Sequence, residues 1–79
     1  MNLRYAFTLN IITKKAVEKR LREYLFLHNY EYEIEVYDYG LETQLFLTIK
    51  NLLPRDVEHL SKLLEAWVVA NGGEVKKEN

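Results

Sequence analysis

The sequence predicts a two-layer α+β domain, and a β-hairpin is its most regular feature. Residues 30–50 alternate apolar and polar side chains on both sides of a turn at Gly40. Alternation over two runs, bounded by turn residues, predicts a strand, a turn and a second strand. One more stretch alternates in the same way, and two others repeat their apolar residues at helical spacing. With 79 residues, the chain forms one domain, residues 1–79, near the lower size limit for a single core.

A first strand is expected over residues 3–11, followed by a helix. Every second residue of that strand is large and apolar: Leu3, Tyr5, Phe7, Leu9 and Ile11. Thr13 is expected to cap the helix, with its hydroxyl accepting a hydrogen bond from an early amide. The helix should end near residues 28–29, because Asn29 tolerates a left-handed backbone. One helical stripe holds Val17, Leu21, Tyr24, Leu25 and His28.

The turn of the hairpin has two interpretations. Gly40 followed by Leu41 suits a type II′ turn, which requires a positive φ only at the glycine. This register places Ile34 opposite Leu47, so that the apolar faces of the two arms, Val36 included, coincide. A three-residue turn over residues 38–40 with a bulge is the alternative.

A second helix follows the hairpin. Pro54 opens it, because proline lacks only an N–H that the first turn leaves unpaired. Its core stripe contains Val57, Leu60, Leu64, Trp67 and Val68. Asn71, Gly72 and Gly73 end it, since glycine adopts the left-handed conformation without strain. Residues 74–79 form either a short fourth strand at the sheet edge or a disordered tail, because Val75 is their single apolar anchor.

These elements give the order β-α-β-β-α, with an optional final β. A helix joins the first two strands, so they should run parallel through a right-handed crossover, and the second arm of the hairpin inserts between them. The result is a ferredoxin-like two-layer sandwich, with an antiparallel or mixed sheet and both helices on one face. This topology is shared by unrelated proteins and says little about function.

Catalytic chemistry has little support in the composition. The chain has no cysteine, and Ser61 is its single serine, which we interpret as a hydrogen-bonded helix serine rather than a nucleophile. The glycines form a turn and a helix cap, so no phosphate loop is present. We therefore expect a non-enzymatic protein without metal or cofactor. A cytoplasmic location is expected because the first residues lack the pattern of a signal peptide.

The open face of the sheet is the leading candidate site. It should display Glu31, Glu33, Glu35, Tyr37, Tyr39 and Phe46. One interpretation is that the glutamates keep an exposed edge strand from pairing with other molecules. The other is an acidic, tyrosine-rich docking surface for a basic protein partner. We expect an interaction or regulatory domain, an inhibitor or adaptor, by analogy with small viral or phage accessory proteins.

Two further partners are considered. The first helix concentrates positive charge, which suggests nucleic-acid binding, although a solvated helix face with internal ion pairs explains it more simply. Its basic residues are Lys14, Lys15, Lys19, Arg20 and Arg22. The other partner is a second copy of the chain. If residues 74–79 leave the first strand unpaired, its edge, or the sheet face, would support a homodimer. No membrane association is expected, because no apolar run is long enough to span a bilayer.

Overall fold

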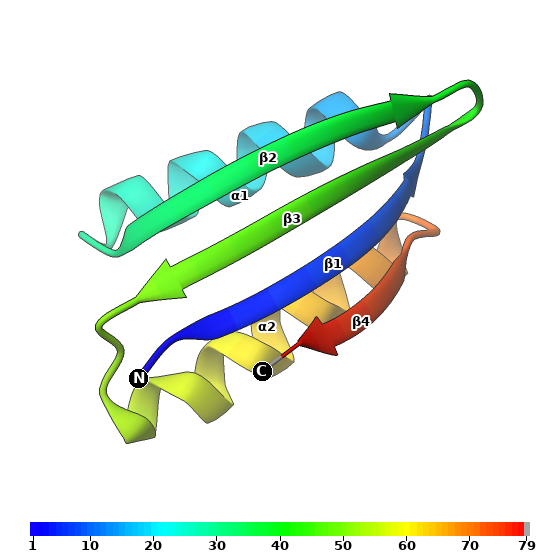
Figure 1. Ribbon diagram of the computed structural model, residues 1–79. Helices are drawn as coiled ribbons and strands as arrows, with labels where there is room; N and C mark the ends of the chain where they lie inside the picture. The colour runs from blue at the N-terminus through cyan, green and yellow to red at the C-terminus, as the bar shows by residue number, and fades with distance from the viewer. Residues whose placement is uncertain (79) are drawn as a thin grey trace.

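The computed structural model describes residues 1–78, which form a four-stranded sheet with two helices on one face (Figure 1). The elements are β1 (Leu3–Asn10), α1 (Lys14–Leu27), β2 (Glu31–Tyr39), β3 (Glu42–Lys50), α2 (Pro54–Ala70) and β4 (Glu74–Glu78). The strand order is β2-β3-β1-β4, and each neighbouring pair is antiparallel. The second arm of the hairpin therefore lies between β1 and β2, which confirms the ferredoxin-like prediction.

The hairpin has the register that the glycine turn predicts. Tyr39 lies opposite Glu42, and Ile34 lies opposite Leu47. Gly40 has a φ of 68°, and Leu41 is not among the residues with positive φ. The two-residue turn is confirmed, and it fixes which side chains of both arms share a face.

The core lies between the sheet and the helices. Tyr5 and Phe7 of β1 stack there with their ring centroids 5.1 Å apart. The fully buried side chains are Leu3, Tyr5, Phe7, Leu9, Leu21, Leu25, Leu45, Leu47, Ile49, Leu60, Leu64 and Val68. They come from the predicted apolar positions of β1, β3 and both helices, so the alternation and the helical stripes predicted these core positions correctly.

The connection between β1 and α1 differs from the prediction. The side-chain oxygen of Asn10 accepts hydrogen bonds from the amides of Ile12 and Thr13 and from the Thr13 hydroxyl, at 2.9–3.0 Å. This local turn ends β1 one residue early and leaves Ile11 49% exposed. The capping role of Thr13 is wrong, because its hydroxyl donates to Asn10 instead of accepting from the helix.

Besides Ile11, two more side chains assigned to the core face are exposed. Val36 is 38% exposed, because it lies toward the hairpin end of an edge strand where the helix covers less of the sheet. His28 is exposed because the helix has already ended at Leu27; its ring lies 4.2 Å from that of Tyr24. The left-handed Asn29, with a φ of 59°, confirms the predicted end of the helix.

Residues 74–78 form β4, which pairs with β1, and Asn79 lies outside the described residues. Thr8 lies opposite Glu74 and Arg4 opposite Glu78, so the strand alternative is confirmed over the described part of this segment. The condition for a homodimer through the first-strand edge is therefore not met, because β4 occupies that edge.

The start of β4 depends on Gly73, which lies against β1 and α2. A Cβ added there would lie 2.6 Å from Cγ1 of Val68 and 3.0 Å from the carbonyl oxygen of Thr8. Contacts this short force either the backbone or stiff neighbours to move. Glycine is thus needed at this position for close approach, whereas at Gly40 it is needed for its positive φ.

We predict that Gly73→Ala lowers the free energy of unfolding by about 1–3 kcal/mol and shifts the amide resonances of β4. Gly40→Ala is the control, because open space surrounds that position and only backbone strain, about 1 kcal/mol, is added. Denaturant unfolding with amide NMR spectra checks both effects. Wild-type stability and unshifted β4 resonances in Gly73→Ala would contradict the close approach.

Candidate functional site: the open sheet face

The structure places all six candidate residues on the open face of the sheet. Five of them occupy every second position of β2 and lie opposite every second residue of β3: Glu31, Glu33, Glu35, Tyr37 and Tyr39. Phe46 is the direct neighbour of Glu35. Both helices cover the other face, and Figure 1 shows the sheet in front of them.

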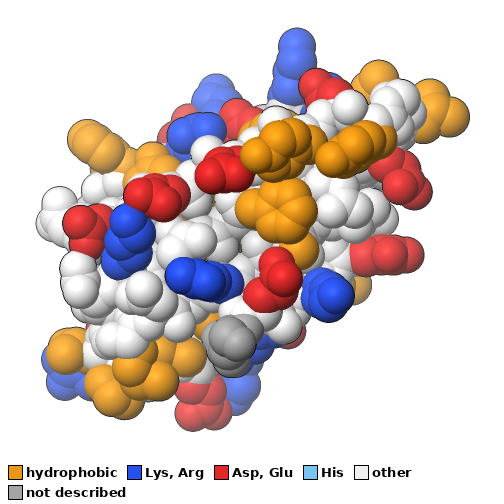
Figure 2. All heavy atoms as spheres, in the orientation of Figure 1, with side chains coloured by type: hydrophobic (Ala, Val, Ile, Leu, Met, Phe, Trp, Pro, Cys, Tyr) orange, Lys and Arg blue, Asp and Glu red, His pale blue; other side chains and the backbone are white. Residues whose placement is uncertain are grey.

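Three of these side chains form an aromatic patch, which we define as Tyr37, Tyr39 and Phe46. The rings of Tyr37 and Phe46 meet edge to face, with centroids 5.8 Å apart and planes at 73°. Tyr37 is 46% exposed and Tyr39 is 64% exposed. Figure 2 shows hydrophobic side chains running from the middle of this face toward the hairpin end of the molecule. At that end Leu41 is 78% exposed.

Each glutamate of β2 has a partner within the chain. Glu33 forms an ion pair with Lys50 at 2.6 Å, and Glu35 accepts a hydrogen bond from the Tyr37 hydroxyl at 2.9 Å. Glu31 accepts a hydrogen bond from the side chain of Asn51. These contacts hold the carboxylates in place, but exposed pairs of this kind contribute little to stability. Replacing these internal contacts by contacts with another molecule would therefore cost little free energy.

The same contacts change two pKa values. The hydrogen bond to Glu35, and then the charge of that carboxylate, raises the pKa of the Tyr37 hydroxyl. The hydrogen bond to Glu33, assisted by its charge, raises the pKa of Lys50. Tyr37 stays neutral and Lys50 stays charged over a wider pH range, so the face keeps its charge pattern well above neutral pH.

The other half of the face comes from β1 and β4. Phe46 separates two shallow hollows, one of about 320 Å³ over Ala6 and Thr8 and one of about 240 Å³ beside Arg4. Among residues 1–78, the open face carries six carboxylates and three cations: Glu31, Glu33, Glu35, Glu42, Glu74, Glu78, Arg4, Lys50 and Lys76. The residues of β4 were not included in the candidate site predicted from the sequence, because residues 74–79 had two interpretations. The small side chains of Ala6 and Thr8 were the signal in the sequence that indicated a hollow.

The basic residues of α1 mostly have partners on the protein itself. Lys14 pairs with Asp38 at 2.8 Å, and this hydrogen bond, with a second from Thr43, lowers the pKa of the Asp38 carboxyl. Two more basic residues form ion pairs within the helix: Lys19 with Glu23 at 3.8 Å, and Arg22 with Glu18 at 3.4 Å. This arrangement matches the simpler interpretation of a helix face with internal ion pairs.

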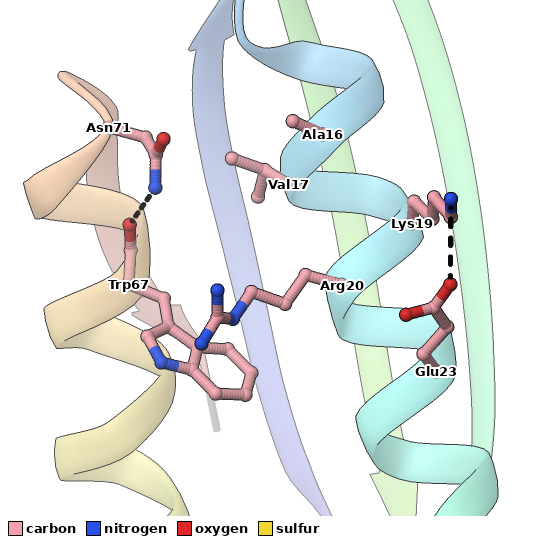
Figure 3. A pocket seen from close by; sticks show the side chains of 7 residues that line it. All are labelled: Ala16, Val17, Lys19, Arg20, Glu23, Trp67 and Asn71. Carbon is pink, nitrogen blue, oxygen red and sulfur yellow. Dashed lines mark hydrogen bonds and ion pairs between the residues drawn. The ribbon is translucent and has the colours of Figure 1, made fainter.

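Arg20 lies across a groove between α1 and α2. Its guanidinium carbon is 4.7 Å from the ring centroid of Trp67, at cation–π distance, and Figure 3 shows the two side chains meeting over the groove. The groove measures about 320 Å³ and includes Ala16 in its lining. Trp67 also contacts Tyr24 edge to face at 5.1 Å. These contacts join the two helices, so Arg20 has a packing role.

Polar groups of α2 and β1 meet between that helix and the sheet. The Tyr5 hydroxyl donates to Glu65 at 3.2 Å, and burial, assisted by the Glu65 carboxylate, raises the pKa of Tyr5 to about 12. Ser61 is buried, and its Oγ lies near the Tyr5 hydroxyl, where it opposes the rise in the pKa of Tyr5, but it makes no hydrogen bond of good geometry among residues 1–78. The hydrogen bond expected of this serine is therefore not formed with the described residues.

No three His, Asp or Glu side chains of the described residues are grouped to hold a metal ion. None of the helices formed by these residues could span a membrane.

We predict that Glu35→Ala lowers the pKa of Tyr37 toward the ordinary value, about 10. The neutral hydroxyl donates to the carboxylate and the phenolate is repelled by it, so removing the carboxylate removes both effects. In wild type the raised pKa favours folding below the unfolded-state value, and this contribution is lost as pH rises through the folded-state value. NMR titration of the tyrosine ring signals measures the shift. Glu42→Ala is the control, and an equal pKa for Tyr37 in Glu35→Ala and wild type would exclude the contact.

Comparison with known proteins supports the fold alone. The de novo designed protein Ferredog-Diesel is similar in structure, with a TM-score of 0.67 and 22% sequence identity, over 100% of this chain and 85% of that one. No protein-family model matches the chain, and no curated protein matches its sequence. At this identity the likeness shows a ferredoxin-like architecture, whereas function has to be argued from the surface.

Proposed function

We propose that this chain is a protein-binding regulatory domain whose open sheet face docks a basic partner. The observation that carries the proposal is the aromatic patch beside a row of carboxylates, on a sheet face that neither helix covers. Regulation would follow from occupying a surface of the partner, as an inhibitor or adaptor does. The proposal assigns the chain no catalytic step or cofactor, and it keeps the cytoplasmic location expected from the sequence.

The aromatic patch supplies apolar contact area at low entropic cost. Tyrosine has few rotatable bonds, and Tyr37 is already held by Phe46 and Glu35, so binding would immobilise little that is mobile. Exposed tyrosine and phenylalanine are enriched in interfaces, where the ring is buried and the hydroxyl keeps a polar contact. The hollow over Ala6 and Thr8 next to Phe46 gives the surface a concave part beside a convex one.

The charge of the face determines which partner it would accept. Carboxylates outnumber cations on it by two to one, and those of β2 lie together along one side (Figure 2). Such a surface attracts a basic partner and repels an acidic one, including the phosphates of nucleic acid. The glutamates would exchange their internal partners for lysine or arginine side chains of the partner.

The test is a pair of charge reversals on the sheet face. Glu33→Lys with Glu35→Lys is expected to weaken binding of the physiological partner about tenfold or more, because attraction becomes repulsion. Glu23→Lys with Glu58→Lys changes the net charge equally on exposed helix positions and is expected to leave binding unchanged. Affinity capture from the source organism with all three chains, then titration with the purified partner, measures the effect. Equal binding by the sheet-face variant and wild type would overturn the proposal.

Nucleic-acid binding through α1 is tested on the same proteins. A variant with Lys15→Ala, Lys19→Ala and Arg22→Ala removes charge from that helix and keeps the sheet face. The proposal expects this variant to bind the protein partner as wild type does. Salt-dependent binding of an oligonucleotide by wild type, lost in the helix variant, would instead favour the nucleic-acid function.

A further inference from the structure

The outer edge of β2 is long and carries no described strand. β2 has nine residues and lies at one end of the sheet, with β3 on its other side. The opposite edge is β4, which has five residues and includes Lys76 and Lys77. Short edges with lysines resist pairing, whereas a long regular edge presents a row of unpaired backbone groups. The two edges of this sheet are therefore not equivalent.

The hairpin register shows which backbone groups point outward from β2. In a two-residue hairpin the closing pair, here Tyr39 and Glu42, exchanges hydrogen bonds between the arms. Every second residue counted back from Tyr39 therefore also directs its backbone groups toward β3; these residues are Tyr37, Glu35, Glu33 and Glu31. The backbone groups of Tyr32, Ile34 and Val36 face the open edge. An added strand would bond to these residues.

Side chains on the two faces of β2 determine what the added strand would contain. On the open face Glu31, Glu33 and Glu35 follow one another at every second position, so the strand placed beside them would need lysine or arginine at every second residue. A second copy of β2 would bring glutamates next to glutamates, which disfavours self-pairing. Charge complementarity thus selects a basic partner over another copy.

The helix-side face of the edge calls for apolar residues. Val36 is 38% exposed there, next to a hollow of about 220 Å³ that is lined by β1, β2, β3 and the start of α1. Leu9 and Leu45 form its apolar part, and charged side chains line the rest: Lys14, which pairs with Asp38, and also Lys15 and Glu18. An apolar side chain on the incoming strand would cover Val36 and enter this hollow. The two faces together specify alternation of basic and apolar residues.

We propose that β2 accepts an extended segment of its partner as a fifth, antiparallel strand, and that this segment alternates lysine or arginine with apolar residues. This inference rests on the proposed function and names the class of partner. Backbone hydrogen bonds along Ile34 and Val36 would supply affinity, while the glutamates and the hollow would supply selectivity.

The probe is a labelled peptide of alternating lysine and valine, as long as β2, titrated against the full chain by fluorescence anisotropy. Val36→Pro removes an outward N–H that the sheet does not use, so the fold is retained while strand addition is blocked. We expect this variant to bind the peptide about tenfold or more weakly, whereas Val36→Thr, which keeps the N–H and loses only part of the apolar contact, should bind several-fold more tightly than Val36→Pro. A peptide of alternating glutamate and valine is expected not to bind.

A second test leaves the protein unchanged and modifies the peptide. The peptide valines would lie opposite Ile34 and Val36 and would donate their own backbone amides to β2. N-methylation of the valines should therefore abolish binding. N-methylation of the lysines, whose amides point away from β2, should preserve it. Equal binding of both methylated peptides, or wild-type affinity in Val36→Pro, would overturn strand addition. If charge reversal of Glu33 and Glu35 still weakened binding of the physiological partner, the proposed docking through the sheet face would stand without strand addition. No binding of the alternating peptide to wild type would also overturn the inference.

Discussion

The central position of β3 is the constraint on which the rest of the structure depends. β3 pairs with β2 on one side and β1 on the other, so its pleat sets the facing of both neighbours. Leu45, Leu47 and Ile49 are buried beneath the helices, and the residues between them, Phe46 among them, lie on the open face. A slip of one residue would exchange these sets and expose the core, so the hydrophobic effect holds the register firmly.

The same constraint determines what the surface can do. With β3 and β1 inside the sheet, β2 becomes an edge, and its glutamates lie on the open face beside the aromatic patch. The local contacts of these glutamates, with Lys50, Asn51 and Tyr37, keep their charges arranged without burying them. In the proposed function, the glutamates that would select a basic strand are the same residues that would discourage self-pairing. The two interpretations of the glutamate row are therefore compatible with each other.

Most of the fold could be predicted from periodicity. Alternation gave β2 and β3 and, through Gly40, their register; the helical stripes gave the core side of α1 and α2. Errors occurred where one local contact overrides a pattern. Ile11 continues the alternation of β1, but the side chain of Asn10 turns the chain before it. Thr13 is a common capping residue, but its hydroxyl is used by the same asparagine.

The candidate site was predictable in part for the same reason. The hairpin register predicts which side chains of β2 and β3 share a face, so the six candidate residues could be placed on the open face together. The hollow beside Phe46 and the cations of β4 were not, because β4 has one apolar anchor and its pairing depends on the close approach at Gly73. Arg20 was assigned to a charged surface, whereas its contact with Trp67 depends on how the two helices pack.

Amide hydrogen exchange along β2 tests most directly whether this strand presents an unpaired edge. In the isolated protein, the amides of Glu33, Glu35 and Tyr37, which face β3, should exchange slowly, and those of Ile34 and Val36 should exchange fast. This alternation should disappear when a basic partner strand binds, because the outward amides become protected. Uniform protection of β2 in the isolated protein, or fast exchange at Ile34 and Val36 in the bound one, would contradict the account.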